Sequence, residues 1–420
     1  MSSVIPIKPE PRKDFELSLD EIAREGARRL LVQALNLEVE EYIEQFTSEV
    51  DESGKRLVVR NGRGKSRSVT VGSGDIDINC PRVDDRRDGE KFISSILPPY
   101  LRKSPKVESL LPILYLKGLS TSDFKSALGT FLGAGTMGLS PSSIVKLKKI
   151  WEAEFDLWKK RAITKKYVYM WVDGVNMQIR LGEDKKVCIL VIIGVTENGE
   201  KELLAVHPGY RESAESWLAV MRSLIDRGLT APKLAIGDGA LGFWSALRSC
   251  KGFEETEEQR CWVHKIANVL DKLPKRVQPD AKGLLHEMMK SPTEADALKI
   301  RKSFEKLFDD KYPKATQCLV KSWSELTTFY HYPAAHWTSL RTTNPIESSF
   351  ATVKHRTRGT KGAGNKETAS AMTFKLLQEC QKKWRKIRGE RQEIQNLIEG
   401  LEYRDGVVVP QSAHQEVVAS

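Results

Sequence analysis

The 420-residue sequence has few cysteines, few histidines and no long apolar segment. No run approaches the ~18 to 20 apolar residues of a membrane-spanning helix, and the first residues lack the apolar core of a signal peptide. The cysteines form no CxxC pair and lie far apart, as is typical of free thiols in a reducing compartment. These absences favour a cytoplasmic protein without a disulfide framework. The six cysteines are Cys80, Cys188, Cys250, Cys261, Cys318 and Cys380.

The remaining composition is that of an ordinary globular protein. Apolar residues make up 40% and charged residues 29% of the chain, and the mean hydropathy is −0.40. These values exclude collagenous, wholly disordered and polytopic membrane classes, and the length allows two to four domains. The 67 basic side chains exceed the 56 acidic ones by 11, and the pI is about 9.2. This surplus favours a polyanionic partner, either nucleic acid or an acidic membrane face, although many proteins carry it without one.

The first hundred residues predict an arm followed by a small domain. Residues 1–16 are polar and proline-rich, so we expect a flexible arm there. A capping-box pattern at 18–21 precedes apolar residues at three- and four-residue spacing, which predicts an amphipathic helix. We expect this helix and a small basic β unit to occupy 17–104.

The β unit contains a concentrated basic segment. Residues 55–67 carry six basic side chains and no acidic one, around the pair Asn61-Gly62. Because Asn-Gly favours the tight turn between paired strands, a hairpin is the expected structure. Arg60 and Arg63 lie beside this turn and are candidate DNA-binding residues.

Residues 105–162 predict helices joined by turns. A short helix, a glycine turn at Gly118, a second helix and a third helix capped by Ser140 resemble a helix-turn-helix. A generic helical bundle without DNA contact explains the same pattern, since nothing in it is unique to DNA binding.

The hydrophobic period changes at about residue 163. Between 163 and 274 the pattern predicts three strands, then alternating helices and strands in the order βββαβαβα, with RCWVH as the last strand. The fold class is therefore α/β, with a mixed sheet covered by helices on both faces. From 275 to 340 only helical patterns occur, which indicates an all-helical insertion. Residues 341–403 predict a helix that contains Glu347, followed by a basic C-terminal helix, and 404–420 predict a disordered tail.

Two aspartates each follow an apolar strand and precede a glycine. They are Asp173 in YMWVDG and Asp238 in LAIGDG. Carboxyl ends of strands are where open α/β sheets place their functional sites. A lone Asp-Gly is more often a simple turn, but two in one sheet favour a site over turn chemistry.

A third carboxylate, Glu347, lies in the segment TTNPIESSF. With Asn344 as the N-cap and Pro345 as the first helical residue, Glu347 fits a capping box without any chemistry. The first turn of a helix also tolerates a carboxylate well, so one residue can serve both roles.

Three carboxylates without a nucleophile pattern are the ligands that hard divalent cations prefer. Two such ions can activate a water or a 3′-hydroxyl and stabilise the oxygen that leaves phosphorus. The chemistry implied is phosphodiester cleavage or exchange. Residues 341–388 carry 12 basic and 3 acidic side chains, so the basic surplus lies next to Glu347. The candidate DNA contacts there are Lys354, two helical turns beyond Glu347, and Arg356, Arg358 and Lys361.

The ordered set Asp173-Gly174, Asp238-Gly239, Cys261-Trp262-Val263-His264 and Asn344-Pro345-Ile346-Glu347 resembles the mutator-type insertion-sequence transposases of bacteria. The resemblance covers roughly residues 20–390. It implies a ribonuclease H-like domain with a DDE triad, interrupted by an all-helical insertion before the glutamate. It also implies two Mg²⁺ ions, with Mn²⁺ as an alternative, and no organic cofactor.

By this resemblance Asp173, Asp238 and Glu347 are the catalytic and metal-binding residues. The implied partners are the terminal inverted repeats of an insertion sequence and a target DNA. The implied assembly is a homodimer or higher oligomer near the bacterial nucleoid, with no role for a membrane.

Cys261 and His264 match a cysteine and a histidine that the family carries. They fit half of a zinc site, for which His331 and His336 would have to supply the rest. They also fit a buried thiol with a core histidine, or a His264 that points into the active site and acts there.

Two other functions remain open from the sequence. A non-catalytic DNA-binding regulator of the same fold would be expected to lack a triad carboxylate, and all three are present. A nuclease that cuts without joining lacks the strand-transfer step.

Overall fold

The computed structural model describes residues 18–89, 91–119, 141–181, 185–209, 211–239, 242–359 and 362–410. The chain divides into two compact units, Met1–Leu147 and Lys148–Ser420. Their boundary lies inside a helix, earlier than the expected one at 162. The predicted arm at 1–16, residues 120–140 of the predicted helix-turn-helix region, Lys361 and residues 411–420 of the predicted tail lie outside the described residues.

The first unit combines a long helix with four short strands. Helix α1 (Leu19–Gln45) begins at the predicted capping box, since Ser18 and Glu21 each accept a hydrogen bond from the other's backbone N–H. Strands β1 (Val58–Arg63) and β4 (Pro81–Asp85) pair antiparallel, as do β2 (Arg67–Val71) and β3 (Gly74–Ile78). Leu35 of α1 packs against Val69, Ile76 and Ile78. Helix α2 (Pro105–Leu116) follows, capped by Ser104.

The expected hairpin at Asn61-Gly62 is wrong. Both residues lie inside β1, where the pairing register with β4 shifts between Arg60 and Arg63. Gly62 has a φ of 61°, which serves an irregularity within the strand rather than a turn between two strands.

The second unit is built on a five-stranded mixed sheet in the order β7-β6-β5-β8-β9. Strands β5 (Tyr167–Gln178), β6 (Lys186–Thr196) and β7 (Lys201–Gly209) are antiparallel neighbours, whereas β8 (Leu234–Gly237) and β9 (Glu257–Arg260) run parallel to β5. Helices α5 (Ala214–Asp226), α6 (Phe243–Arg248) and α7 (Trp262–Leu270) alternate with the last strands. The predicted βββαβαβα order is confirmed.

One detail of that prediction is wrong. The last strand ends at Arg260, and Cys261 is the N-cap of α7, so Cys261 and His264 open a helix instead of lying on a strand.

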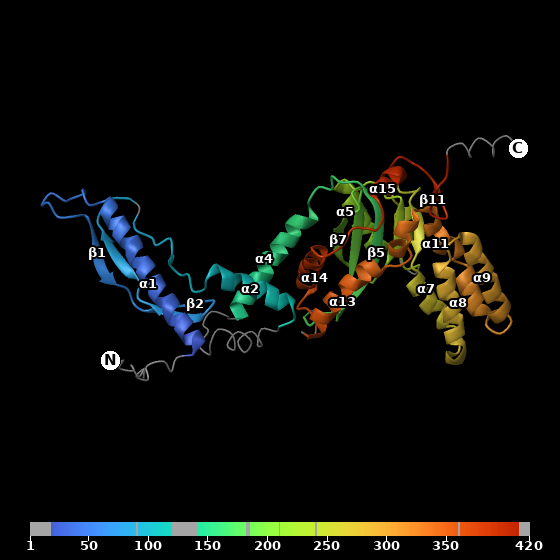
Figure 1. Ribbon diagram of the computed structural model, residues 1–420, viewed down its shortest axis with the longest axis horizontal. Helices are drawn as coiled ribbons and strands as arrows, with labels where there is room; N and C mark the ends of the chain where they lie inside the picture. The colour runs from blue at the N-terminus through green and yellow to red at the C-terminus, as the bar shows by residue number, and fades with distance from the viewer. Residues whose placement is uncertain are drawn as a thin grey trace, which may run out of the picture. The chain divides into compact units, whose positions relative to one another are not determined.

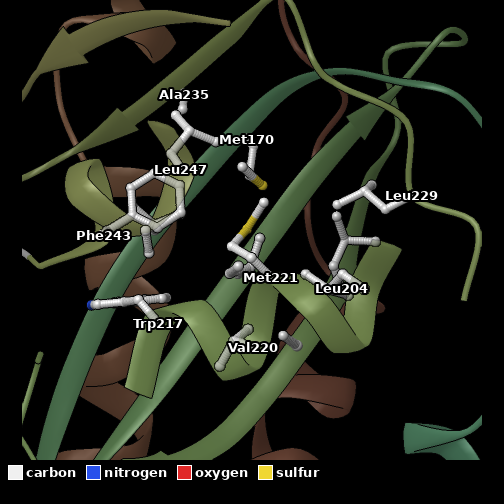
Figure 2. Close-up of a cluster of buried hydrophobic side chains, with 14 of the residues drawn as sticks. Met170, Leu204, Trp217, Val220, Met221, Leu229, Ala235, Phe243 and Leu247 are labelled. Atoms are coloured by element: carbon white, nitrogen blue, oxygen red, sulfur yellow. The ribbon is translucent and has the colours of Figure 1, made fainter. Parts of the chain in front are cut away.

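Helices cover both faces of the sheet (Figure 1). Figure 2 shows Trp217 and Met221 of α5, with Phe243 of α6, packed against Met170 of β5 on one face. The other face meets α13 (Asn344–Gly359) and α14 (Lys366–Gln381). Because side chains alternate along a strand, Asp173 shares this second face with Trp171, whose indole N–H bonds Ser339.

The stretch 275–340 contains helices and no strand, as predicted. Helices α8 and α9 lie side by side, and α11 contacts β9 (Figure 1). The helices of this insertion are η1 (Lys275–Val277), α8 (Gln278–Lys290), α9 (Glu294–Phe308), α10 (Pro313–Val320), α11 (Trp323–Thr327), η2 (Thr328–His331), η3 (Ala334–His336) and α12 (Trp337–Leu340).

The remaining elements come from the beginning and the end of the second unit's sequence. Helix α4 (Pro141–Lys159) packs Phe155 and Trp158 against Phe374 of α14. After α15 (Arg391–Ile398), strands β10 (Tyr403–Arg404) and β11 (Val407–Val408) form a hairpin. The expected disordered tail from 404 therefore begins with ordered residues. Among the described residues no helix is long and apolar enough to cross a membrane.

Candidate active site

The two aspartates lie at the same level on adjacent parallel strands. Trp171 of β5 is in register with Ile236 of β8, and Asp173 and Asp238 each follow two residues later. Asp173 accepts a hydrogen bond from the backbone N–H of Gly174 at 2.7 Å. One carboxylate oxygen of Asp238, Oδ1, is buried and has no hydrogen-bond partner. A buried carboxylate oxygen without a donor is an available ligand for a cation.

The glycines that follow the aspartates provide space. Gly174 continues within β5, so a simple turn does not explain the first pair, whereas Gly239 does lie in the turn after β8. Neither glycine has a positive φ. A Cβ on Gly174 would lie 2.2 Å from Oε1 of Glu212, and one on Gly239 would lie 2.0 Å from Cζ of Arg260. A charged side chain therefore lies directly over each glycine.

Glu347 reaches the same site from the first turn of α13. The segment that leads into the helix is anchored by a hydrogen bond from the backbone N–H of Trp262, in α7, to the carbonyl of Arg341, at 2.9 Å. The Glu347 carboxylate accepts a hydrogen bond from the hydroxyl of Thr343. It does not close the capping box expected with Asn344, whose own N–H bonds the hydroxyl of Thr342. The glutamate instead bonds Thr343, the residue just before the helix, and its Oε1 lies 3.8 Å from Nδ1 of His264.

The electrostatics show that the three predicted carboxylates lie in one neighbourhood. Burial raises the pKa of Asp173 to about 7, the Gly174 N–H and His264 oppose this rise, and Glu212 and Glu347 add to it. Burial also raises the pKa of Glu212, and Asp238 raises it further. Asp173 therefore responds to the charges of Glu212 and Glu347, and Glu212 responds to that of Asp238.

Glu212 is the residue that the sequence analysis missed. It lies in the turn between β7 and α5, half-buried, with its carboxylate over Gly174. Acidic residues in turns are usually solvated, and Glu212 does not follow an apolar strand directly, so no local signal distinguished it. The turn after β7, tied to the start of α6 by the hydrogen bond from Gly242 N–H to the Glu212 carbonyl, places it over Gly174.

Cys261 and His264 also face the carboxylates. The Sγ of Cys261 lies 3.3 Å from the N of Thr343 and 3.2 Å from its Oγ1. Nδ1 of His264 lies 3.8 Å from Oε1 of Glu347. The interaction with Cys261 raises the pKa of His264 to about 9, against the effect of burial, and the charges of Asp238 and Glu347 contribute. A thiol, a hydroxyl and a carboxylate therefore form a connected series that ends on Glu347.

The expected alternative of a four-ligand zinc site is not formed. Donor atoms of Cys261, His264 and Glu347 lie within 4.8 Å of one another. The other two histidines of that hypothesis have different partners, since His331 pairs with Glu257 and His336 bonds the hydroxyl of Tyr169. Anionic oxygens dominate the wider group, which suits a hard cation better than zinc.

The predicted DNA-binding residues separate into exposed and buried side chains. Lys354 and Arg358 are exposed on α13, one turn apart, on the side of the helix that carries Glu347. Arg356 is only 1% exposed, because it lies on the inner side of α13 with Val353, so its prediction as a surface contact is wrong. Arg60 and Arg63 are exposed on β1.

Comparison with known proteins identifies the family of this chain. The family model described as "Transposase, Mutator family" matches residues 9–387. The transposase for insertion sequence element IS6120 of Mycolicibacterium smegmatis is 48% identical over 282 residues, which are 67% of this chain and 86% of that protein.

Two further relatives extend the similarity. The transposase for insertion sequence element IST2 of Acidithiobacillus ferrooxidans is 44% identical over 284 residues, 67% of this chain and 95% of its own. The transposase for insertion sequence element ISRM5 of Rhizobium meliloti is 24% identical over 374 residues, 89% and 91% of the two chains. Because the family model spans most of the sequence and close relatives match along two thirds of it, this chain belongs to the Mutator family of transposases.

Proposed function

We propose that this protein binds the terminal inverted repeats of an insertion sequence and catalyses metal-dependent cleavage and strand transfer there. The observation that carries the proposal is the placement of Asp173 and Asp238 at one level of β5 and the end of β8, with Glu347 electrostatically coupled to Asp173. The strand order β7-β6-β5-β8-β9 supports a ribonuclease H-like core.

The residues present fit a pair of Mg²⁺ or Mn²⁺ ions held by Asp173, Asp238 and Glu347. Oδ1 of Asp238 has no hydrogen-bond donor, and the pKa of Asp173 is raised. Both features are expected of carboxylates whose charged form a bound cation would stabilise. Two such ions, when bound, activate a water or a 3′-hydroxyl for attack on phosphorus and stabilise the leaving oxygen. Glu212 offers a fourth carboxylate beside them.

The protein's own groups prepare these ligands. Near neutral pH Asp173 is partly protonated, so binding a cation displaces a proton from it. Thr343 and Cys261 hold the Glu347 carboxylate in one orientation. His264 is charged at neutral pH and its Nδ1 lies 3.8 Å from Oε1 of Glu347, where the ring can donate a hydrogen bond to a phosphate oxygen.

The exposed bases of α13, Lys354 and Arg358, would contact the backbone of DNA whose phosphate lies at the carboxylates. Arg60 and Arg63 of the first unit would contact the terminal repeats. A homodimer or higher oligomer would hold two ends together during joining, in the cytoplasm near the nucleoid.

The decisive experiment uses DNA ends taken from the sequences that flank the reading frame. Purified protein with Mg²⁺ should cleave such ends and join them to a target, whereas EDTA should abolish both. Asp173→Asn and Glu347→Gln should each reduce cleavage by roughly 10³-fold or more while DNA binding persists. Asp226→Asn, which changes an exposed carboxylate at the end of α5, is the matched control and should leave the rate unchanged.

The same assay tests the alternatives. Cut ends without joined product would indicate a nuclease. DNA binding without any cleavage in Mg²⁺ or Mn²⁺ would indicate a non-catalytic regulator. Full activity in Glu347→Gln would show that the third ligand is wrongly assigned.

A further inference from the structure

A groove of about 1000 Å³ lies at the end of the central strands, beside the carboxylates. Its walls are the end of β5, the start of β6, the end of β7 with the following turn, and the start of α14. The polar side chains that line it are Asn176, Gln178, Lys185, Lys186, Arg211, Glu212 and Lys366.

The lining is strongly basic. Lys185, Lys186, Arg211 and Lys366 are all exposed, and among the lining residues that the structure describes Glu212 is the single acidic one. Lysine, arginine and side-chain amides are the groups that proteins use to contact phosphate oxygens. A surface with this lining repels cations and attracts a polyanion, in contrast to the neighbouring carboxylate site.

The turn between β7 and α5 connects the groove to that site. Arg211 has a φ of 58°, a left-handed conformation that is uncommon for a residue with a side chain. The carbonyl of the next residue, Glu212, accepts a hydrogen bond from Gly242 N–H at 3.0 Å, which ties the turn to the start of α6. Arg211 and Glu212 both line the groove, and the Glu212 carboxylate also lies over Gly174, next to Asp173. Glu212 is therefore shared by the groove and the carboxylate cluster.

The opposite wall is fixed to the sheet. Residues 362–364 run beside the end of β5, where Ala363 N–H bonds the carbonyl of Gln178 at 2.9 Å and Arg180 N–H bonds the carbonyl of Ala363 at 3.0 Å. A Cβ on Gly362 would lie 2.3 Å from the Gln178 carbonyl oxygen, so only glycine permits this approach. This pairing holds Lys366 at the rim, at the positive end of α14.

We propose that this groove binds the phosphodiester backbone of the DNA strand that continues from the reacting phosphate. The proposal rests on the proposed function, because it takes the carboxylates as the place where that phosphate lies. Two strands have this chemistry: the flanking DNA beyond the cleaved end, and the target strand during joining.

The first test measures activity and salt dependence in Lys185→Ala/Lys186→Ala. The matched control is Lys302→Ala/Lys306→Ala, two exposed lysines one turn apart on α9. At about 0.7 released counterions per phosphate of single-stranded DNA, losing two contacts should lower the slope of log affinity against log salt by about 1.4. The control should keep the original slope. An unchanged slope in the groove variant overturns the proposal.

Two substrates distinguish whether the groove binds the flanking DNA or the target strand. If the groove holds the flank, the variant should cleave flanked ends about tenfold more slowly and join pre-cleaved ends normally. If the groove holds the target strand, joining of pre-cleaved ends should fall about tenfold and cleavage should persist. Normal rates in both arms overturn the proposal.

A crosslinking experiment detects DNA bound in the groove without requiring catalysis. Iodouracil placed at each of the first few nucleotides beyond the reacting phosphate, in flank or in target, is irradiated with the full-length Asp173→Asn protein in Ca²⁺. Adducts within 176–188 or 208–212 support the proposal, and adducts confined to other segments overturn it. If the unmodified protein fails to cleave any DNA end, the proposed function fails, whereas the adducts still report whether a strand occupies the groove.

Discussion

Two histidines near one face of the central sheet have opposite electrostatic surroundings. His264 lies among Cys261, Asp238 and Glu347, and its pKa is raised to about 9. His336 is fully buried against the Tyr169 hydroxyl, and burial lowers its pKa to about 4. Burial disfavours charge on both rings, so the difference comes first from the interaction of His264 with Cys261 and then from the charges of Asp238 and Glu347.

The comparison separates a chemical site from a core site. Around His336 a single carboxylate, Glu393, lies 3.7 Å from Nε2, and it does not offset the loss of water. Around His264 several acidic groups converge in a region that is only half-buried, as a site for cations and phosphate requires. The same residue type serves chemistry in one place and packing in the other.

The largest expected effect comes from removing a charge near His264. Asp238→Asn should reduce cleavage by roughly 10³-fold or more, because it neutralises an oxygen ligand. It should also lower the pKa of His264 from about 9, since Asp238 is one of the groups that raise it. Cleavage assays and NMR titration of the imidazole measure the two effects. A His264 pKa unaffected by the substitution would contradict the described cluster.

A second prediction concerns stability in acid. The folded pKa of His336, about 4, lies below its ordinary value of 6.5, so the unfolded chain binds a proton first as the pH falls. The contribution of His336 is complete above pH 6.5 and is lost between pH 6.5 and 4. The loss approaches about 3 kcal/mol, at about 1.4 kcal/mol per pKa unit. Denaturant unfolding across this range measures it, and His336→Gln should flatten the slope.

The two rings should also differ under the same substitution. His264→Gln should slow cleavage about 10²-fold with little change in unfolding free energy, because it removes a charged donor from the site. His336→Gln should destabilise the fold by about 1 to 3 kcal/mol, through the bond to Tyr169, and leave the rate per folded molecule unchanged. Rates and unfolding curves for both variants test this contrast. Equal effects on both quantities would mean that the rings serve one role.

The smallest predicted effect concerns the hydroxyl between Cys261 and Glu347. Thr343→Val keeps the side-chain shape but removes that hydroxyl, so it should weaken Mg²⁺ binding about tenfold. Thr343→Ser retains the hydroxyl and should bind nearly normally. Calorimetric titration of the metal-free protein compares the two. If the variants bind metal equally well, the hydroxyl does not orient Glu347.

Much of the second unit follows from local pattern. Apolar strands with period two, helices with caps, and the insertion without strands were all readable, because each depends on neighbours in sequence. Asp173 and Asp238 were readable for the same reason, since each lies where an apolar strand ends or reaches its polar half.

Other features depended on contacts between distant segments. Arg356 is basic and follows a basic pattern, yet its position on α13 places it inside. Gly62 follows the hairpin rule and instead accommodates a register shift within β1. The local sequence is compatible with an exposed or a buried Arg356, and with a turn or a strand at Gly62. Contacts between distant segments decided which of the two structures formed.

The order of strands and helices, the two Asp-Gly strand positions and the excess of basic residues after Glu347 were determined by the sequence itself. The tertiary structure decided which groups meet: Glu212 over Gly174, His264 beside Glu347, and a basic groove built from four separate segments. The reason is physical. Propensity and periodicity act over a few residues, whereas a shared electrostatic environment requires register and packing between strands and helices far apart in the chain.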